Sequence, residues 1–425
     1  MNDHPPDTLG TLPEHGSEDA ERSQLTNGMT VLTRERPHAD VTALSISVRG
    51  GSRNEADETV GAAHFMEHMF FQGTPSRPSS DQVFQPVTAR GGWLNAYTSF
   101  ENINFQAVVK NDDSALALET LSDMLVNSLF EEEKIDKERQ VVLEELIRGK
   151  NEPRRYAVEL FFRAVFADHP ARNLPIGSRE TINNSDRRVL SAFRDTNFVA
   201  GNMVAAVVGN QRHQQVVEAF EAAFAAMPSD PRPPFPTAPL PKPRPQRVEE
   251  STVGTQAQIA LGLPMPGADH PDTYALDILS ATLGEVGRRL VREIRDQRGL
   301  ASSVSSSYST LSDIGAWWAL VGTSPANVDT VIDLILTEVR RIRDERLAEE
   351  ALADAKSYIE GRAVLNLQSS IAFAQYLADR EVLGVEPPLQ EYLARVGQVT
   401  VDDVARAANA YLDPSAYTLV ILRPD

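Results

Sequence analysis

The sequence predicts an α+β protein of two similar halves, each a mostly antiparallel sheet packed with helices. Apolar residues alternate with other residues in the segment 44–48, the period of a half-buried strand, and they alternate again in 259–263. Each of these segments is followed by an expected helix, at 61–71 and at 273–283. The chain has 425 residues, which is too long for one ordinary core, so at least two domains are expected.

The first half is expected to open with an arm, a hairpin and three helices. Residues 1–24 are polar and predict a disordered arm. The Asn-Gly pair at 27–28 predicts a tight turn, because both central residues of such a turn need positive φ. Helices are then expected at 61–71, along a stripe formed by Leu118, Leu121, Leu125 and Leu129, and at 133–148.

A proline-rich segment marks the boundary between the halves. The 18 residues from Pro228 to Pro245 contain nine of the chain's 27 prolines. Proline removes a backbone donor and favours extended geometry, so a semi-rigid linker is expected over residues 228–246. It separates a first domain, residues 25–227, from a second domain, residues 247–425. Each half also ends alike, with an expected helix, a turn and an apolar strand.

Composition excludes several classes of protein. The formal charge of −19 argues against a nucleic-acid binder. It is compatible with a basic or extended peptide substrate, although a solvated acidic surface explains it more simply. The chain has no cysteine, so a metal would need His and carboxylate ligands. No run approaches the roughly 18 apolar residues of a membrane span. We expect a soluble, cytoplasmic protein, or a periplasmic one if a signal peptide has been removed.

The central motif is His64-Phe65-Met66-Glu67-His68. In a helix, positions i, i+3 and i+4 share one face, so both histidines can bind one zinc ion with Glu67 beside it. This is the inverted order of the H-E-x-x-H arrangement. Zinc at a catalytic site needs a third protein ligand and an open position for water. Glu67 is expected to be the base that accepts a proton from that water.

The third ligand is expected to be a carboxylate from another helix. The segment 138–145 offers Glu138, Glu144 and Glu145. Glu138 and Glu145 are seven residues apart, which is two helical turns, and therefore lie on one face. Glu144 points about 100° away from Glu145 and is the weaker candidate.

These residues resemble those of the M16 peptidase family, especially its short bacterial M16B members and the beta-type subunits of mitochondrial processing peptidases. That family has H-x-x-E-H, a metal-binding Glu at a similar distance, and another Glu seven residues before it. By this resemblance Glu145, 77 residues after His68, is the third ligand, and Glu138 supports the catalytic site from outside it. The match continues at residues 51–55, 91–98, 298–301 and 322–325.

The resemblance implies two homologous domains that face each other as a half-clamshell, with one zinc ion in the first domain and none in the second. It implies a zinc-dependent endopeptidase that hydrolyses extended or unfolded peptides in a closed chamber. The substrate would add as a strand along the edge that contains Asn95, Ala96 and Thr98. Arg295 matches a family Arg that reaches over the substrate, and a structural ion pair is the alternative for it.

One departure from the family pattern concerns a Tyr seven residues after that Arg. Ser302 stands there and has no phenol to reach a substrate carbonyl, and Tyr308 is not expected to replace it. We therefore expect a homologous M16-like subunit to supply the Arg/Tyr pair in a heterodimer. The alternatives are a non-catalytic, core-type subunit of an M16-fold complex and a metal-dependent hydrolase that acts on substrates other than peptides.

Overall fold

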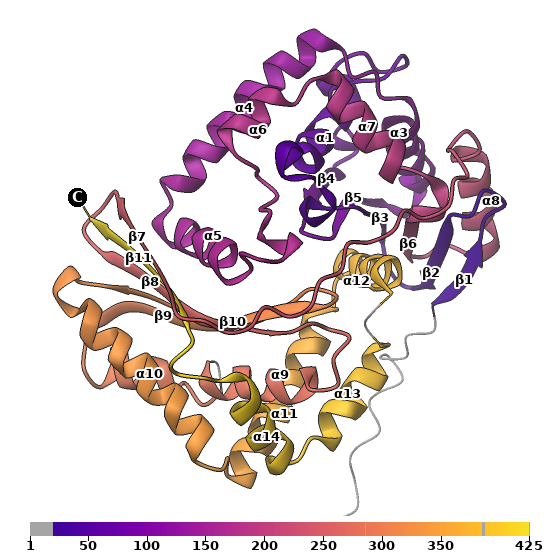
Figure 1. The fold of residues 1–425 in the computed structure, drawn as a ribbon. Helices are drawn as coiled ribbons and strands as arrows, with labels where there is room; N and C mark the ends of the chain where they lie inside the picture. The colour runs from indigo at the N-terminus through magenta and orange to yellow at the C-terminus, as the bar shows by residue number, and fades with distance from the viewer. Residues whose placement is uncertain (1–19, 285, 385–386, 425) are drawn as a thin grey trace, which may run out of the picture.

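The computed structural model describes residues 20–284, 286–384 and 387–424 and shows two lobes, each with one sheet (Figure 1). The strands are β1 (Glu21–Gln24), β2 (Thr30–Glu35), β3 (Val41–Arg49), β4 (Trp93–Thr98), β5 (Asn102–Lys110), β6 (Met203–Gly209), β7 (Gln246–Thr252), β8 (Ala257–Pro266), β9 (Ala301–Thr310), β10 (Ile314–Thr323) and β11 (Thr418–Pro424). The helices are α1 (Ala62–Phe70), α2 (Ser80–Thr88), α3 (Ser114–Asn127), α4 (Glu132–Lys150), α5 (Pro153–Val165), α6 (Arg179–Asn184), α7 (Arg187–Asn197), α8 (His213–Ala223), α9 (Thr273–Leu283), α10 (Val328–Asp344), α11 (Glu349–Asn366), α12 (Ser370–Leu383), α13 (Leu389–Gln398) and α14 (Val401–Tyr411).

The two sheets share one strand order. The six-stranded sheet of the first lobe runs β1-β2-β6-β3-β5-β4, and the five-stranded sheet of the second lobe runs β7-β11-β8-β10-β9. In each sheet a parallel pair, β2–β6 or β7–β11, is followed by three antiparallel pairs. Apart from β1, every strand of one sheet therefore has a counterpart in the other. The predicted α+β fold with two mostly antiparallel, homologous domains is confirmed.

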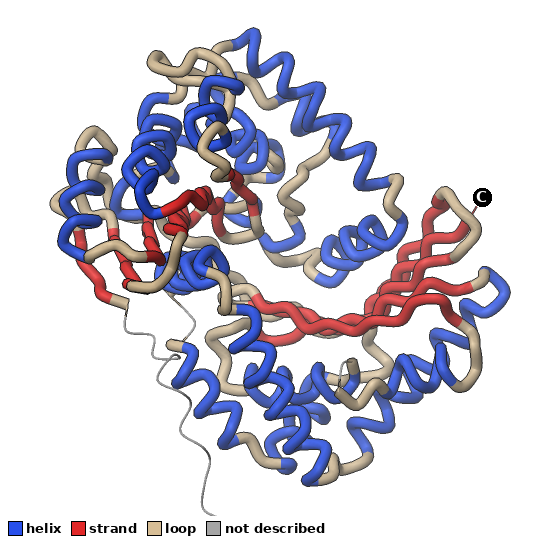
Figure 2. Tube along the Cα trace, turned by 180° about the vertical axis from the view of Figure 1, so that it is seen from behind, coloured by secondary structure: helices blue, strands red, loops and turns tan. Residues whose placement is uncertain are grey.

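The two halves of the chain exchange a helix in space. α5 comes from the first half, and its Leu160 and Phe161 pack in one apolar cluster with Ala260 and Val420 of the second sheet. α12 comes from the second half, and its residues pack against β3 and β6 of the first sheet. Figures 1 and 2 show both helices between the lobes. The sequence boundary at 228–246 therefore does not separate the two lobes cleanly.

The exchange changes the environment of β3. The sequence analysis expected a half-buried strand here, but both of its faces are buried. Leu44, Ile46 and Val48 belong to the core of the first lobe, while α12 covers the opposite face. The serines on that face are buried with partners: Ser45 donates to Asn104 Oδ1 at 3.0 Å and Ser47 to a carboxylate of α12 at 2.8 Å. The half-buried prediction was wrong because the covering helix comes from the other half of the chain.

Smaller corrections concern the start of the first lobe. Residues 21–24, expected in the arm, form β1 and pair with β2, while residues 1–19 lie outside the described residues. The hairpin turn is present, but only Gly28 has positive φ, at +98°, and Asn27 does not. The turn spans 25–29, closed by the N–H of Leu25 donating to the Met29 carbonyl, so it is not the two-residue type. α3 ends at Asn127, so the expected stripe loses Leu129.

The proline-rich segment lies against both lobes. Residues 228–245 form neither helix nor strand, and β7 begins at Gln246. The ring of Phe235 lies 4.6 Å from the guanidinium of Arg53, whose Nη2 donates to the Pro236 carbonyl at 2.6 Å. Arg53 is fully buried and also bonds Glu101 at 2.6 Å and Asp313 at 2.8 Å. One guanidinium thus joins the first lobe, the linker and the second lobe.

No helix in the described part of the chain is long and apolar enough to cross a membrane.

Candidate metal centre

Helix α1 carries both histidines, and two residues fix where it starts. Gly61, just before the helix, has φ +101°, and a Cβ there would lie 3.1 Å from Gly177 Cα. The buried Glu55 carboxylate accepts the N–H groups of Gly61 at 2.9 Å and Ala63 at 2.6 Å. Burial raises the pKa of Glu55 to about 8, and these two donors oppose that rise. The start of α1 is therefore locked, which sets the face on which the histidines lie.

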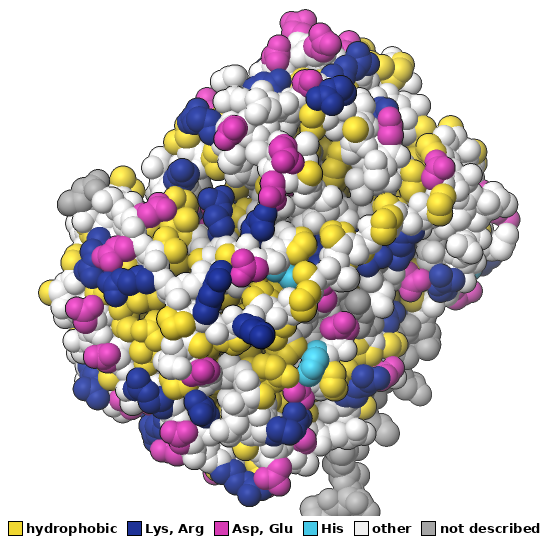
Figure 3. Space-filling view, in the orientation of Figure 1, with side chains coloured by type: hydrophobic (Ala, Val, Ile, Leu, Met, Phe, Trp, Pro, Cys, Tyr) yellow, Lys and Arg dark blue, Asp and Glu magenta, His cyan; other side chains and the backbone are white. Residues whose placement is uncertain are grey.

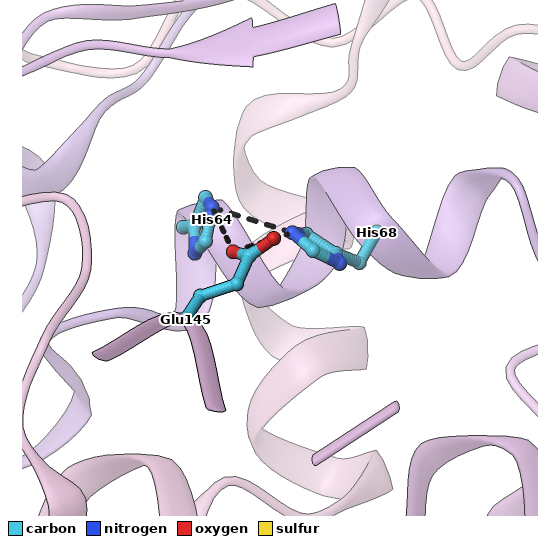
Figure 4. A group of neighbouring side chains, drawn as sticks. All are labelled: His64, His68 and Glu145. Carbon is cyan, nitrogen blue, oxygen red and sulfur yellow. Dashed lines mark hydrogen bonds and ion pairs between the residues drawn. The ribbon is translucent and has the colours of Figure 1, made fainter. Parts of the chain in front are cut away.

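Three side chains from two helices meet at one point (Figure 4). His64 and His68 of α1 bring their Nε2 atoms to 3.3 Å, and Glu145 Oε2 of α4 lies 3.6 Å and 3.5 Å from them. Two ligand atoms about 2.1 Å from one zinc ion, at a tetrahedral angle, would lie about 3.4 Å apart. The three distances between the candidate ligand atoms, 3.3, 3.5 and 3.6 Å, are close to that value. Two imidazoles and a carboxylate are also a donor set that zinc prefers, so the residues fit the ion.

The second carboxylate of α4 orients one histidine. Glu138 is buried and lies 2.7 Å from His68 Nδ1, and its other oxygen accepts from Gln72 Nε2 at 2.7 Å. With Nδ1 directed at Glu138, His68 Nε2 faces His64 and Glu145. Burial lowers the pKa of His68, but the hydrogen bonds with the two glutamates outweigh burial and raise it to about 10. The two carboxylates therefore stabilise positive charge at this point.

The other histidine is held neutral. Burial, and then the charge of His68, lower the pKa of His64 to about 4. Its buried Nδ1 has no hydrogen-bond partner among the described residues. A neutral imidazole presents a lone pair to a metal, so this state suits a ligand.

Glu67 lies on the same helix but outside the group of three. Its Oε2 accepts a hydrogen bond of 2.6 Å from Thr98 Oγ1 of β4. Burial raises the pKa of Glu67, and the Thr98 hydroxyl opposes that rise. Thr98 was predicted to contact substrate, which stays a prediction, and the structure adds that its hydroxyl is directed to Glu67. No sequence pattern indicated this contact, because it depends on how β4 lies over α1.

The residues predicted to contact a substrate strand lie on β4. β4 is one of the two edge strands of its sheet, paired only with β5 among the described strands. Asn95 is exposed on it, and Ala96 is half-buried against the core of the first lobe. The outer side of β4 therefore presents unpaired backbone groups to whatever lies beside it.

The second half does not bring its candidate residues to the metal group. Arg295 lies on the short π-helix η7 (Val291–Asp296), donates to Asp296 at 2.9 Å and lines a separate cavity. Ser302 donates to Gln256 Oε1 at 3.1 Å. Tyr308 donates to the Pro266 carbonyl at 3.1 Å, and its ring packs on the core of the second lobe. The phenol of Tyr308 thus points into the protein.

A cavity of about 510 Å³ opens beside the metal group. His64 and Thr98 form part of its wall, and α5, the segment 174–176 and Leu320 of β10 contribute further. The cavity is therefore bordered by both lobes and reaches one of the histidines.

Comparisons with known proteins show which family the chain resembles. Residues 30–177 match the family model described as insulinase (peptidase family M16), and residues 185–359 match the peptidase M16 inactive domain. The chain is 30% identical over 410 residues to an uncharacterized zinc protease of Streptomyces coelicolor, covering 94% of this chain and 88% of that protein. It is 29% identical to the mitochondrial-processing peptidase subunit beta of Lentinula edodes, covering 92% and 87%. The chain belongs to the M16 peptidase family.

Solved structures show the same fold. A protease from Helicobacter pylori superposes with a TM-score of 0.87 and 26% identity, covering 96% of this chain and 99% of that one. A peptidase M16 inactive domain from Pseudomonas fluorescens superposes with a TM-score of 0.86 at 19% identity and supports the fold alone.

Proposed function

We propose that this chain is a zinc-dependent endopeptidase that hydrolyses extended or unfolded peptides in a closed chamber. The observation that carries the proposal is the triangle of His64, His68 and Glu145, with edges of 3.3, 3.5 and 3.6 Å. The names of several relatives, zinc protease and processing peptidase, support it. A zinc ion held there would polarise a scissile carbonyl and lower the pKa of a water molecule.

The protein's own groups supply the proton transfers and the positioning. Thr98 holds Oε2 of Glu67, which leaves Oε1 to take a proton from the attacking water and return it to the leaving amine. Glu138 keeps His68 oriented. The open edge of β4 can pair with an extended peptide, so that recognition uses mainly the substrate's main chain.

A peptide-cleavage assay with a chelator tests the proposal. The purified chain should cut an unstructured, internally quenched peptide, lose that activity with a zinc chelator, and regain it when zinc is added back. A non-catalytic, core-type subunit would show no zinc-dependent cleavage, alone or with a partner. A hydrolase of another class would leave peptides intact and cleave a different bond in the same metal-dependent way.

We further propose that a homologous M16-like partner completes the site. Arg295 is paired with Asp296, Ser302 has no phenol, and the Tyr308 hydroxyl is directed at Pro266. Positioned donors that stabilise a transition state are worth several kcal/mol, so the isolated chain should be slow. Adding a subunit that carries the Arg/Tyr pair should raise the rate, and Ser302→Tyr should raise it in part. Full activity of the isolated chain, abolished by Tyr308→Phe, would contradict this.

A further inference from the structure

The cavity beside the metal group has an apolar wall with two arginines. Phe100 and Phe162 contact each other at a ring distance of 5.8 Å, and Leu320 adds to the same wall. Arg154 and Arg155, in the first turn of α5, border the cavity as well. His64 also lines the cavity. A substrate side chain that enters the cavity therefore belongs to a residue beside the cleaved bond.

Arg154 has a charge that no carboxylate of the described residues pairs with. Its Nη1 donates to Ser303 Oγ at 2.6 Å and its Nη2 to Ser305 Oγ at 3.2 Å, both on β9 of the second lobe. Within the described ranges it forms no ion pair, and burial alone lowers its pKa. Two neutral hydroxyls fix the guanidinium but leave its charge uncompensated, and three of its five N–H groups remain to donate. Such a group in a partly apolar wall favours a bound anion.

Arg155 adds a second cation at the same mouth. It pairs with Glu159 at 2.8 Å across one helical turn, and its side chain is half exposed. Arg155 and His64 line the same cavity. The ionised groups of α5 that border the cavity are therefore two arginines and one glutamate, a net positive set.

This local charge differs from that of the whole molecule. The chain carries a formal charge of −19, yet Figure 3 shows several Lys and Arg side chains, together with Asp or Glu, near a histidine between the lobes. Salt screens exposed charges beyond about 8 Å at physiological ionic strength, so the charged groups that border the cavity count for more in binding there than the formal charge of the whole chain. The overall charge had made a basic substrate conceivable, but the cavity favours an acidic group.

We propose that this cavity is a specificity subsite that takes a carboxylate-bearing residue of the substrate next to the cleaved bond, with Arg154 as its anion anchor. The apolar wall would hold the aliphatic part of that residue, and the guanidinium would donate to its carboxylate as a planar fork. The carboxylate belongs either to an Asp or Glu side chain or to the terminus of the substrate. The inference rests on the proposed peptidase function and names its substrate class.

The first experiment compares matched peptides. The zinc-loaded chain, with its partner subunit if one is required, is given peptides that differ only in Glu, Gln or Lys at each position flanking the cleaved bond. A second set carries the C-terminus as a free acid or as an amide, which separates the two sources of carboxylate. We expect kcat/KM for one Glu peptide, or for one free acid, to exceed that of its neutral match by about tenfold or more, as for a charge-assisted hydrogen bond.

Variants of α5 test whether Arg154 binds the carboxylate. Arg154→Gln should bring the ratio of kcat/KM between the acidic peptide and its neutral match close to one. Arg154→Lys, which keeps the charge but loses the planar fork, should give an intermediate ratio. Arg163→Gln is the matched control, because Arg163 lies on the same helix but lines a different cavity. The control should keep the wild-type ratio. Zinc content and the thermal midpoint of each variant report whether it is folded.

A binding measurement separates this inference from the proposed function. Zinc-loaded Glu67→Gln should bind the Glu or free-acid peptide about tenfold more tightly than its neutral match, measured by fluorescence anisotropy. If no peptide is cleaved but this preference is present and depends on Arg154, the peptidase proposal fails and the subsite stands. Equal binding and cleavage of all matched peptides, or a preference that Arg154→Gln retains as fully as Arg163→Gln, would overturn the subsite.

Discussion

At the scale of single residues, hydrogen bonds assign different roles to three carboxylates that lie close together. Glu145 faces both Nε2 atoms, Glu138 lies at the far nitrogen of His68, and Glu67 is held by Thr98. Of these three carboxylates, only that of Glu145 contributes an oxygen to the group of three candidate ligand atoms. These partners give the three carboxylates different proposed roles, as a metal ligand, an orienting group and a base, where side-chain type alone does not.

Replacing Glu67 tests the role of the base. Glu67→Gln should retain zinc, because Glu67 is outside the ligand group, and the amide can still accept the hydrogen bond from Thr98. Peptide cleavage should fall by about 10² to 10⁴, the usual contribution of a general base. Single-turnover assays on samples of matched zinc content measure this. Turnover near the wild-type rate in a metal-replete sample would refute the role.

Sequence patterns predicted much of this site, because its main parts are local. The histidines are four residues apart on one helix, so periodicity alone places them together. The choice of Glu145 came from the family resemblance, since two glutamates on one face were equally suitable. Gln72, one turn beyond His68, has a detectable helical spacing but was missed. Thr98 and Arg154 reach the site through tertiary contacts, which no single-segment pattern contains.

At the scale of elements, the exchanged helices hold the lobes to each other. α12 carries the buried Asp379, whose carboxylate accepts hydrogen bonds from Tyr97, Asn102, Asn104 and Ser47 of the first sheet. Tyr97 precedes Thr98 on β4, so α12 and Glu67 contact opposite faces of the same edge strand. The buried face of α12 consists of Phe373, Ala374, Leu377, Ala378 and Val382, and the sequence of the helix does not indicate which sheet covers that face.

Removing the Asp379 carboxylate should destabilise the first lobe strongly. Asp379→Ala leaves several buried donors without an acceptor, and we expect a loss of about 3 kcal/mol or more in the free energy of unfolding. Glu381→Ala on the same helix is the control, because its pair with Arg22 is partly exposed and should contribute less than about 1 kcal/mol. Urea unfolding measures both. Equal losses of unfolding free energy in the two variants would show that the buried hydrogen bonds of Asp379 contribute no more than the partly exposed ion pair of Glu381.

At the scale of the whole molecule, a buried ion cluster joins the lobes. Arg53 of the first lobe is fully buried against Asp313, which lies just before β10 in the second lobe. Burial raises the pKa of Asp313, but His169 and Arg53 outweigh burial and hold that pKa well below its usual 3.8. Because the folded-state pKa is depressed, the ionised carboxylate stabilises the fold fully above the unfolded value. That stabilisation is lost as the pH falls below the unfolded-state pKa and then through the folded-state pKa.

Asp313→Asn should therefore show a pH-dependent effect. At pH 7 the variant should lose about 3 kcal/mol in the free energy of unfolding, the usual cost of removing one partner of a buried pair. Below about pH 4 the difference from wild type should narrow, because the Asp313 carboxylate of the unfolded wild-type chain becomes protonated while that of the folded protein stays ionised, which lowers the stability of the wild type alone. Denaturation midpoints at neutral and acid pH provide the comparison. A difference that stays constant or grows toward acid pH would show that the charge of Asp313 is not what joins the lobes.

We propose that His64, His68 and Glu145 form one zinc site, and the zinc content of the purified protein and its variants tests this proposal. The wild-type chain, purified without added metal, should contain about one zinc ion by elemental analysis. Glu144→Gln should retain that zinc, because Glu144 is exposed on the neighbouring position of α4. Glu145→Gln should lose most of it. Equal zinc content in the two variants, or no zinc in the wild type, would show that His64, His68 and Glu145 do not form a zinc site together.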